Sequence, residues 1–217
     1  MAAISKAVTS SGADLGVIFD CDGDRGAAVF SDGSEVNRNT LIALMAAILE
    51  EKNPGATVVT DSVTSDELNV FLEKDLGMKH LRFKRGYKNV INKGIELNAA
   101  GINCPLAIET SGHGALKENY FSDDGAYLCV KIICKAAQLR AEGRSIKDLI
   151  STLGAPAESE EIRYTIKGDN FADYGKKVLL DFTAFANADP HVSARSGHPD
   201  QSGVQDSRRN KGHCGPA

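Results

Sequence analysis

The chain has 217 residues, of which 42% are hydrophobic and 25% are charged, a composition typical of a globular protein with one large or two small domains. Its 25 Lys and Arg against 29 Asp and Glu give a net charge of −4, so there is no basic surplus for binding nucleic acid or an anionic membrane. The longest apolar run, residues 41–49, has about half of the roughly 20 residues that a membrane helix needs.

The cysteines and the first residues indicate the compartment. Residues 1–6 lack the charged and apolar regions of a signal peptide. The five cysteines are odd in number and contain no C-x-x-C pair, which disfavours a disulfide framework or a tetrahedral zinc site. We therefore expect a reducing, cytoplasmic environment.

The first elements are two strands and a helix. The apolar run at residues 14–20 predicts a buried strand that ends in acidic residues, and residues 27–30 predict a second strand followed by a tight Asp32-Gly33 turn. Apolar side chains with helical spacing over 41–49 predict a helix, which Asn53-Pro54-Gly55 ends. The Pro54-Gly55 pair marks a domain boundary.

Strands and helices then alternate as far as residue 141. We expect a capping box at Thr64-Ser65-Asp66-Glu67 to open a helix that ends near Gly77. The remaining predicted elements are strands at 56–60, 80–83 and 105–109 and helices at 88–98 and 124–141, the last after a polar loop. This order predicts an α/β fold of mixed, mostly parallel sheets covered by helices.

The last part of the chain has a different pattern. Ser145-Ile146-Lys147-Asp148 predicts a capped short helix, residues 154–157 a linker, and the alternating residues 161–167 a half-exposed strand. Residues 187–217 contain few large apolar side chains and many Gly, Pro, Ser and Arg. Such a segment buries too little apolar surface to offset its chain entropy, so we expect it to be a disordered tail.

Three carboxylates follow the first strand at alternate positions, and they are the sharpest local feature of the sequence. Asp20, Asp22 and Asp24 flank Gly23 in a loop where they can converge on one hard cation, which predicts a Mg²⁺ site; the alternative is a solvated acidic turn. An EF-hand is excluded, because its sixth and twelfth positions would be Arg25 and Ser31. A haloacid-dehalogenase-like phosphatase would instead use Asp20 as a nucleophile.

A second polar group follows the strand at 105–109. Glu109, Ser111 and His113 offer acceptors, a hydroxyl and an imidazole that suit a polyhydroxylated ligand; the alternative is a polar loop in which His113 bonds only to the backbone. Upstream, Lys84, Arg85 and Lys88 surround a glycine and form either an anion contact or a solvated face. Asp123 and Asp124 stand at a helix start, where capping is the expected role.

Taken in order, these motifs resemble the α-D-phosphohexomutase family, the phosphoglucomutases and phosphomannomutases. The resemblance rests on Leu15-Gly16-Val17-Ile18-Phe19-Asp20-Cys21-Asp22-Gly23-Asp24-Arg25, Lys84-Arg85-Gly86-Tyr87-Lys88, Glu109-Thr110-Ser111-Gly112-His113 and Asp123-Asp124-Gly125, and covers about residues 13–150. It implies Mg²⁺ ligation by Asp20, Asp22 and Asp24, and substrate binding by Arg25, Lys88, Glu109, Ser111 and His113. The implied substrate is a hexose phosphate, of glucose or mannose, with no nucleic acid and no membrane as partner.

The resemblance also implies a domain plan and a reaction. Residues 1–53 would be the end of the metal-binding second domain, 54–153 the third, sugar-recognition domain, 154–186 the start of the fourth, and 187–217 the tail. The family's reaction is an isomerisation by intramolecular phosphotransfer, in which a phosphoserine and a bisphosphorylated sugar carry the phosphate between the 1- and 6-positions.

Two family features are missing from the sequence. It contains no Ser-His-Asn-Pro-like loop for the phosphoserine, and Arg195-Ser196 only faintly echoes the phosphate loop of the fourth domain. We therefore assign no catalytic residue and expect an inactive fragment, produced by a truncated or partly mis-translated gene. The alternatives are a phosphatase that uses Asp20 and a non-catalytic module that binds sugar phosphates.

Overall fold

The computed structural model describes residues 1–156, 165–166 and 170–188. The chain forms two compact units, Met1–Ser159 and Glu160–Ala217. Within the described residues, no helix combines the length and apolar content that crossing a membrane requires.

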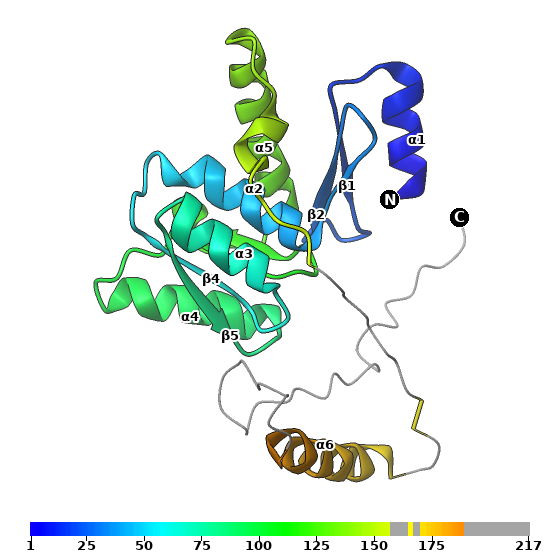
Figure 1. Cartoon of the computed structure of the whole chain (residues 1–217), viewed down its shortest axis with the longest axis vertical. Helices are drawn as coiled ribbons and strands as arrows, with labels where there is room; N and C mark the ends of the chain where they lie inside the picture. Colours follow the sequence, from blue (N-terminus) through cyan, green and yellow to red (C-terminus); the bar gives the residue numbers. More distant parts are fainter. Residues whose placement is uncertain (157–164, 167–169, 189–217) are drawn as a thin grey trace. The chain divides into compact units, whose positions relative to one another are not determined.

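The first sheet is a three-stranded antiparallel sheet with the order β1-β2-β3. Its strands are β1 (Leu15–Phe19), β2 (Gly26–Phe30) and β3 (Glu35–Val36), and β1 pairs with β2 from Leu15↔Phe30 to Phe19↔Gly26. The two predicted strands are confirmed, and their sheet has no parallel pair among the described residues. The sequence prediction omitted β3 and the helix α1 (Ala2–Ser11), which packs beside this sheet (Figure 1).

The second sheet has four strands in the order β5-β4-β6-β7. They are β4 (Thr57–Asp61), β5 (Lys79–Phe83), β6 (Leu106–Ile108) and β7 (Gly114–Leu116). β4 is parallel to both β5 and β6, and only β7 is antiparallel. The expected α/β fold with a mixed, mostly parallel sheet is therefore confirmed here, although the segment predicted to be a polar loop contains β7.

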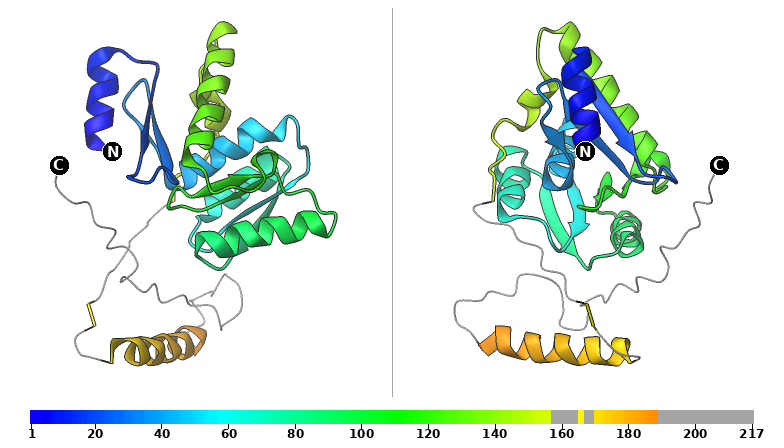
Figure 2. Two further views of the ribbon diagram at one scale, coloured as in Figure 1. Left: turned by 180° about the vertical axis from the view of Figure 1, so that it is seen from behind. Right: turned by 90° about the vertical axis from the view of Figure 1, so that its right-hand side faces the viewer.

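Helices cover both faces of the second sheet (Figures 1 and 2). They are α2 (Arg38–Glu50), α3 (Asp66–Val70), α4 (Tyr87–Ala99) and α5 (Gly125–Ala141). Adjacent residues of β4 point to opposite faces, so Val58 joins the large apolar cluster under α2, α3 and α5, and Val59 joins a smaller one under α4. The inner strands β4 and β6 are thus buried on both sides, whereas the edge strand β5 is only partly buried.

The start of α3 corrects the predicted capping box. Ser65 is the N-cap, and its hydroxyl accepts a hydrogen bond from the Leu68 amide (3.2 Å). The Thr64 hydroxyl instead accepts from the Arg82 guanidinium (3.0 Å), because a buried hydroxyl next to a strand has tertiary partners that a sequence motif does not show. The α-helix ends at Val70 and continues as a π-helical turn, Phe71–Asp75.

The other predicted caps are present. The side chain of Asp124 caps α5, and Ser145 with Asp148 forms a capping box at the 3₁₀ turn Ile146–Ile150. In the second unit, α6 (Phe171–Ala188) was not predicted, and it includes Asn187 and Ala188, where we expected the tail to begin. Residues 189–217 of that tail lie outside the described residues, as does the predicted strand at 161–167 apart from 165–166.

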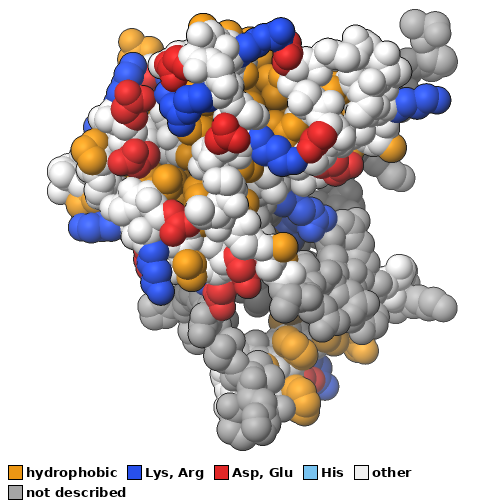
Figure 3. All heavy atoms as spheres, turned by 45° about the horizontal axis from the view of Figure 1, so that its top comes forward, with side chains coloured by type: hydrophobic (Ala, Val, Ile, Leu, Met, Phe, Trp, Pro, Cys, Tyr) orange, Lys and Arg blue, Asp and Glu red, His pale blue; other side chains and the backbone are white. Residues whose placement is uncertain are grey.

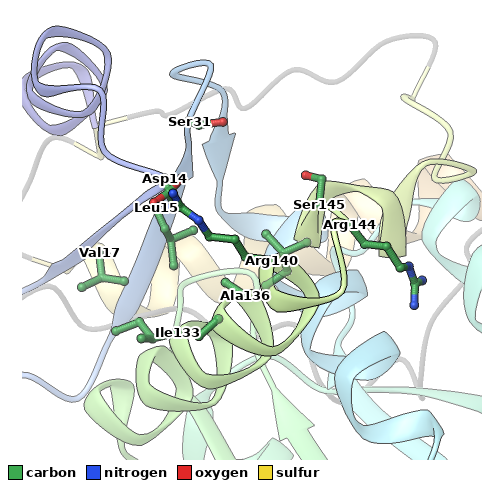
Figure 4. Close-up of a pocket in the computed structure, with 12 residues that line it drawn as sticks. Asp14, Leu15, Val17, Ser31, Ile133, Ala136, Arg140, Arg144 and Ser145 are labelled. Carbon is green, nitrogen blue, oxygen red and sulfur yellow. Dashed lines mark ion pairs between the residues drawn. The ribbon is translucent and has the colours of Figure 1, made fainter.

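A groove of about 750 Å³ lies between α5 and the start of β1 (Figure 4). Its lining is partly apolar, with Leu15, Val17 and Ile133, and an ion pair between Asp14 and Arg140 joins its two sides. None of the residues predicted for metal or substrate binding lines it. On the face shown in Figure 3, basic and acidic side chains are interspersed around apolar ones, which agrees with the near-balanced charge of the sequence.

Candidate functional site

The acidic loop, residues 20–25, connects β1 to β2. Because the two strands are antiparallel neighbours, the loop begins and ends at the same place, and its alternate side chains converge. One carboxylate oxygen from each of Asp20, Asp22 and Asp24 lies within 4.8 Å of the others. Asp22 is exposed, whereas Asp20 and Asp24 are half-buried.

Arg25 holds the first carboxylate of this loop. The Arg25 side chain donates from Nε to Asp20 Oδ2 (2.5 Å), and its backbone amide donates to Oδ1 (3.2 Å). Burial acts to raise the pKa of Asp20, but these hydrogen bonds and the arginine charge hold it below its usual value. Asp20 is therefore kept ionised, as a metal ligand must be.

The second loop, called here the Glu109 loop, comprises residues 109–113 and connects β6 to β7. Glu109 is only 5% exposed. Its carboxylate accepts from the Gly86 amide (2.6 Å) and from the Ser111 hydroxyl (3.1 Å). Burial is the largest influence on this carboxyl and raises its pKa above the usual value. The predicted pair Glu109 and Ser111 is thus in direct contact, and Ser111 is exposed toward solvent.

Asp61 supports the Glu109 loop from the neighbouring strand, and the sequence analysis missed it. It is fully buried at the end of β4. Its two oxygens accept from the amide (3.1 Å) and the hydroxyl (2.7 Å) of Thr110. The carboxyl ends of parallel strands meet at one edge of a sheet, so the acidic residue at the end of β4, matching Glu109 directly after β6, was the signal that could have identified it.

The two loops meet through their backbones. Arg25 and His113 form an isolated antiparallel bridge, and the Gly26 amide donates to the Gly112 carbonyl (3.3 Å). Gly112 has a φ of +98°, a conformation that side chains disfavour. Next to this contact, a Cβ added at Gly125 would lie 2.5 Å from the Arg25 carbonyl carbon, so the start of α5 reaches the acidic loop only because residue 125 is glycine.

His113 lies where these loops meet. Its Nδ1 is 2.8 Å from Asp123 Oδ2 and 3.6 Å from Asp24 Oδ2. The Tyr87 ring stacks on the imidazole with the centroids 4.7 Å apart and the planes at 17°. Burial lowers the pKa of His113, but the hydrogen bond and charge of Asp123, together with Asp24, raise it overall. The alternative in which His113 bonds only to backbone does not describe this side chain.

Lys88 has a less direct place in the site. It is exposed in the first turn of α4, and its Nζ lies 5.8 Å from the centroid of the Tyr87 ring. Among the described contacts, Tyr87 rather than Lys88 touches the Glu109 loop. The resemblance pointed to this segment but not to the aromatic side chain, because stacking depends on the angle at which α4 meets the loop.

The acidic loop has a donor set that fits a hard divalent cation. Carboxylate oxygens are the ligands that Mg²⁺ prefers. In addition, Asp24 Oδ1 is buried and has no hydrogen-bond partner among the described residues, an arrangement that costs free energy unless another group satisfies the oxygen. Burial also raises the pKa of Asp24, and the neighbouring carboxylates reinforce the rise against the opposite effect of His113. A cation would relieve both costs.

Comparison with known proteins identifies the family. Residues 37–155, more than half of the chain, match the family model described as phosphoglucomutase/phosphomannomutase, alpha/beta/alpha domain III. That match covers the second sheet and the Glu109 loop, where the polar side chains gather. The chain therefore belongs to the phosphoglucomutase/phosphomannomutase family, as the order of its sequence motifs indicated.

Individual relatives extend the similarity beyond that domain. The chain is 33% identical over 175 residues to a phosphomannomutase/phosphoglucomutase of Pseudomonas putida, which covers 80% of this chain and 35% of the relative. It is 33% identical over 173 residues to a phosphoglucosamine mutase of Thermotoga petrophila, with 78% and 38% covered. The chain thus spans little more than a third of the length of these curated relatives.

A solved structure gives the same result for the fold. A phosphoglucomutase/phosphomannomutase family protein from Burkholderia thailandensis superposes with a TM-score of 0.58 at 29% sequence identity. The superposition covers 70% of this chain and 31% of the other. The mixed α/β arrangement is therefore the one found in this family.

Proposed function

We propose that this chain carries the metal-binding loop and the sugar-recognition loop of a phosphohexomutase. In this proposal Asp20, Asp22 and Asp24 bind Mg²⁺, and the Glu109 loop binds a hexose phosphate of glucose or mannose. The observation that carries the proposal is the backbone contact between the loops, Arg25 with His113 and Gly26 with Gly112. This contact supports the proposal because it brings three carboxylates that could bind a cation close to a carboxylate and a hydroxyl that could bind sugar hydroxyls, and phosphoryl transfer on a sugar requires both functions.

In this proposal, one set of side chains binds the sugar and another binds its phosphate. Glu109 and Ser111 supply an acceptor and a hydroxyl for sugar hydroxyl groups. Arg25, His113 and the exposed Lys88 supply donors for phosphate oxygens. Mg²⁺, when bound, neutralises charge on the phosphoryl group that is transferred. Arg25 also keeps Asp20 ionised and oriented. In this proposal Arg25 therefore serves both the acidic loop and the contact with the phosphate.

Calorimetric titration with glucose 1,6-bisphosphate, with and without Mg²⁺, tests this proposal. We expect saturable binding that is tighter with Mg²⁺, and a loss of about tenfold in affinity for Glu109→Ala, since one charged hydrogen-bond partner is removed. Lys135→Ala, on α5 and outside the site, is the matched control. Absence of saturable binding under both conditions would contradict the proposal.

We further propose that the chain by itself has no mutase turnover. The sequence has no Ser-His-Asn-Pro-like segment to supply the phosphoserine that accepts and returns the phosphate. Coupled assays of the pure protein should detect no interconversion of glucose 1-phosphate and glucose 6-phosphate. Reproducible turnover above a blank that contains the Asp20→Ala variant would refute this part.

In the phosphatase alternative, Asp20 would be a nucleophile and not a metal ligand. A nucleophilic carboxylate needs a free oxygen directed at the phosphorus, whereas both Asp20 oxygens accept hydrogen bonds from Arg25. We expect the chain to hydrolyse p-nitrophenyl phosphate no faster than the Asp20→Asn variant. A rate that depends on Asp20 would favour the phosphatase.

We retain the cytoplasm as the proposed compartment. Cys104 and Cys129 are buried, unpaired thiols whose pKa values burial raises to about 11. Inert, protonated thiols of this kind are compatible with a reducing environment.

A further inference from the structure

Asp123 and Asp124 are adjacent, but they have different partners. Asp124 accepts from the Tyr127 amide (2.8 Å) and from the Asn119 side chain (3.1 Å), so it caps α5. Asp123 faces His113 instead, with Oδ2 2.8 Å from Nδ1. Because one N-cap carboxylate satisfies the helix, α5 does not need the side chain of Asp123.

The backbone around Asp123 is held in place. Asp123 forms an isolated antiparallel bridge with Ala115 of β7, and the Asp124 amide donates to the Gly114 carbonyl (3.1 Å). Gly114 directly follows His113, so the carboxylate and the imidazole belong to one rigid pair of segments. The geometry of their contact is therefore set by the sheet and not by a mobile loop.

Burying Asp123 has a cost that the fold does not explain. Its side chain is 16% exposed, and its Oδ1 is buried with no hydrogen-bond partner among the described residues. An unsatisfied buried carboxylate oxygen destabilises a protein. A residue retained at such a cost is expected to serve a site rather than stability.

The imidazole is held from two directions. Tyr87 stacks on its face, and Asp123 engages Nδ1. No hydrogen bond or ion pair to Nε2 occurs among the described residues. A carboxylate that accepts from one ring nitrogen fixes the orientation and the tautomer, and so determines what the other nitrogen can do.

We propose that Asp123 is a positioning residue: it accepts from Nδ1 and so directs Nε2 of His113 toward the bound hexose phosphate. There Nε2 accepts from a sugar hydroxyl when the ring is neutral and donates to a phosphate oxygen when the ring is protonated. This inference rests on the proposed function for its ligand. Asp123 itself does not touch the ligand, and its effect passes through His113. Tyr87 limits the tilt of the same ring.

The orientation of His113 can be measured without any ligand. In ¹⁵N-labelled protein at about pH 9, where histidine is neutral, two-bond ¹H–¹⁵N spectra should show the wild-type ring protonated at Nδ1, with His113→Gln used for assignment. Asp123→Ala should shift the ring to a mixture of tautomers. Asp124→Ala, the matched control, should leave the ring signals unchanged and lower the thermal midpoint by about 2–4 °C through loss of the cap.

Binding separates positioning from a purely structural role. For glucose 1-phosphate with Mg²⁺, we expect Asp123→Ala to weaken the affinity about tenfold. Asp123→Asn keeps an acceptor for Nδ1–H, so its affinity should stay within about threefold of the wild type. Asp124→Ala should leave the affinity unchanged. Unchanged tautomer signals in Asp123→Ala overturn the inference, as does unchanged affinity. If the wild type binds no hexose phosphate, the proposed function fails, and the tautomer spectra alone decide whether Asp123 positions the ring.

Discussion

The acidic loop and the Glu109 loop are built in the same way but hold their carboxylates in different environments. Each connects a strand to its antiparallel neighbour, and each strand pair is followed by a long helix, α2 after β1–β2 and α5 after β6–β7. The difference is the flanking strand. β6 has β4 beside it, whereas β1 is at the edge of its sheet among the described residues.

That difference determines the environment of the carboxylates. Asp61 at the end of β4 and the Gly86 amide after β5 surround the Glu109 loop, so Glu109 is buried and its pKa is raised. Among the described residues no strand lies beside β1 on its outer edge, and Arg25 keeps the pKa of Asp20 low. One supersecondary unit can therefore present either a half-buried carboxylate with a lowered pKa or a buried carboxylate with a raised pKa, depending on what lies beside the strand.

The largest expected effect comes from separating the start of α5 from the acidic loop. Gly125→Ala places a Cβ 2.5 Å from the Arg25 carbonyl carbon, which forces backbone atoms apart. We expect a loss of about 2–4 kcal/mol in the free energy of unfolding, measured by urea denaturation. Ser122→Ala, exposed three residues earlier, should change it by less than about 0.5 kcal/mol. Equal stability of both variants would mean that the start of α5 is not in close contact with the acidic loop.

A pH titration tests the half-buried His80 of the second sheet. His80 on β5 hydrogen-bonds to Thr60 and Asn69, and burial, with the charge of Arg82, lowers its pKa to about 4. His80 takes up its proton near pH ~6.5 in the unfolded chain and only near pH 4 in the folded chain. The corresponding contribution to the free energy of unfolding is therefore fully present above pH ~6.5, and about 2–3 kcal/mol of it is lost as the pH decreases toward 4.

Unfolding midpoints of the wild type and His80→Gln between these pH values measure the effect. The variant should lose most of this pH dependence. A parallel decline in both proteins would assign the dependence to other groups.

Two substitutions that each neutralise a carboxylate test whether Mg²⁺ binding depends on the acidic loop and not on the Glu109 loop. Asp24→Asn removes the charge of one proposed metal ligand and should weaken Mg²⁺ binding by at least about tenfold, whereas Glu109→Gln should leave it within about twofold. Competition with Mn²⁺, followed by electron paramagnetic resonance, gives both affinities. Equal losses in the two variants would contradict separate roles.

The smallest effect is expected at the ion pair that joins the two regions across the groove. Arg140 and Asp14 are each about two-thirds exposed, with side-chain exposures of 68% and 67%. Exposed pairs contribute about 0–1 kcal/mol, so Asp14→Asn should hardly change the urea midpoint, and any difference should vanish in high salt. A larger, salt-independent loss would show that the pair anchors β1 against α5.

The sequence alone predicted the elements whose signals are local. Helical spacing identified α2, apolar runs identified β1, β4 and β6, and the capping box at Ser145 was correct. It failed for β7, a three-residue strand within a polar segment, because such a strand is stabilised by pairing with β6 and not by its own composition. The cap of α3 was misplaced by one residue, since Thr64 is engaged by Arg82.

The same distinction between local sequence signals and tertiary contacts applies to the candidate site. The residue types and their order were sufficient to identify the family and to propose Asp20, Asp22, Asp24, Glu109, Ser111 and His113, because these residues follow strands directly and carry their chemistry in their side chains. Which of them touch was decided only by the tertiary structure. Asp61, Tyr87 and Asp123 reach the site from other elements, and contacts between residues far apart in a chain depend on how its sheets and helices pack.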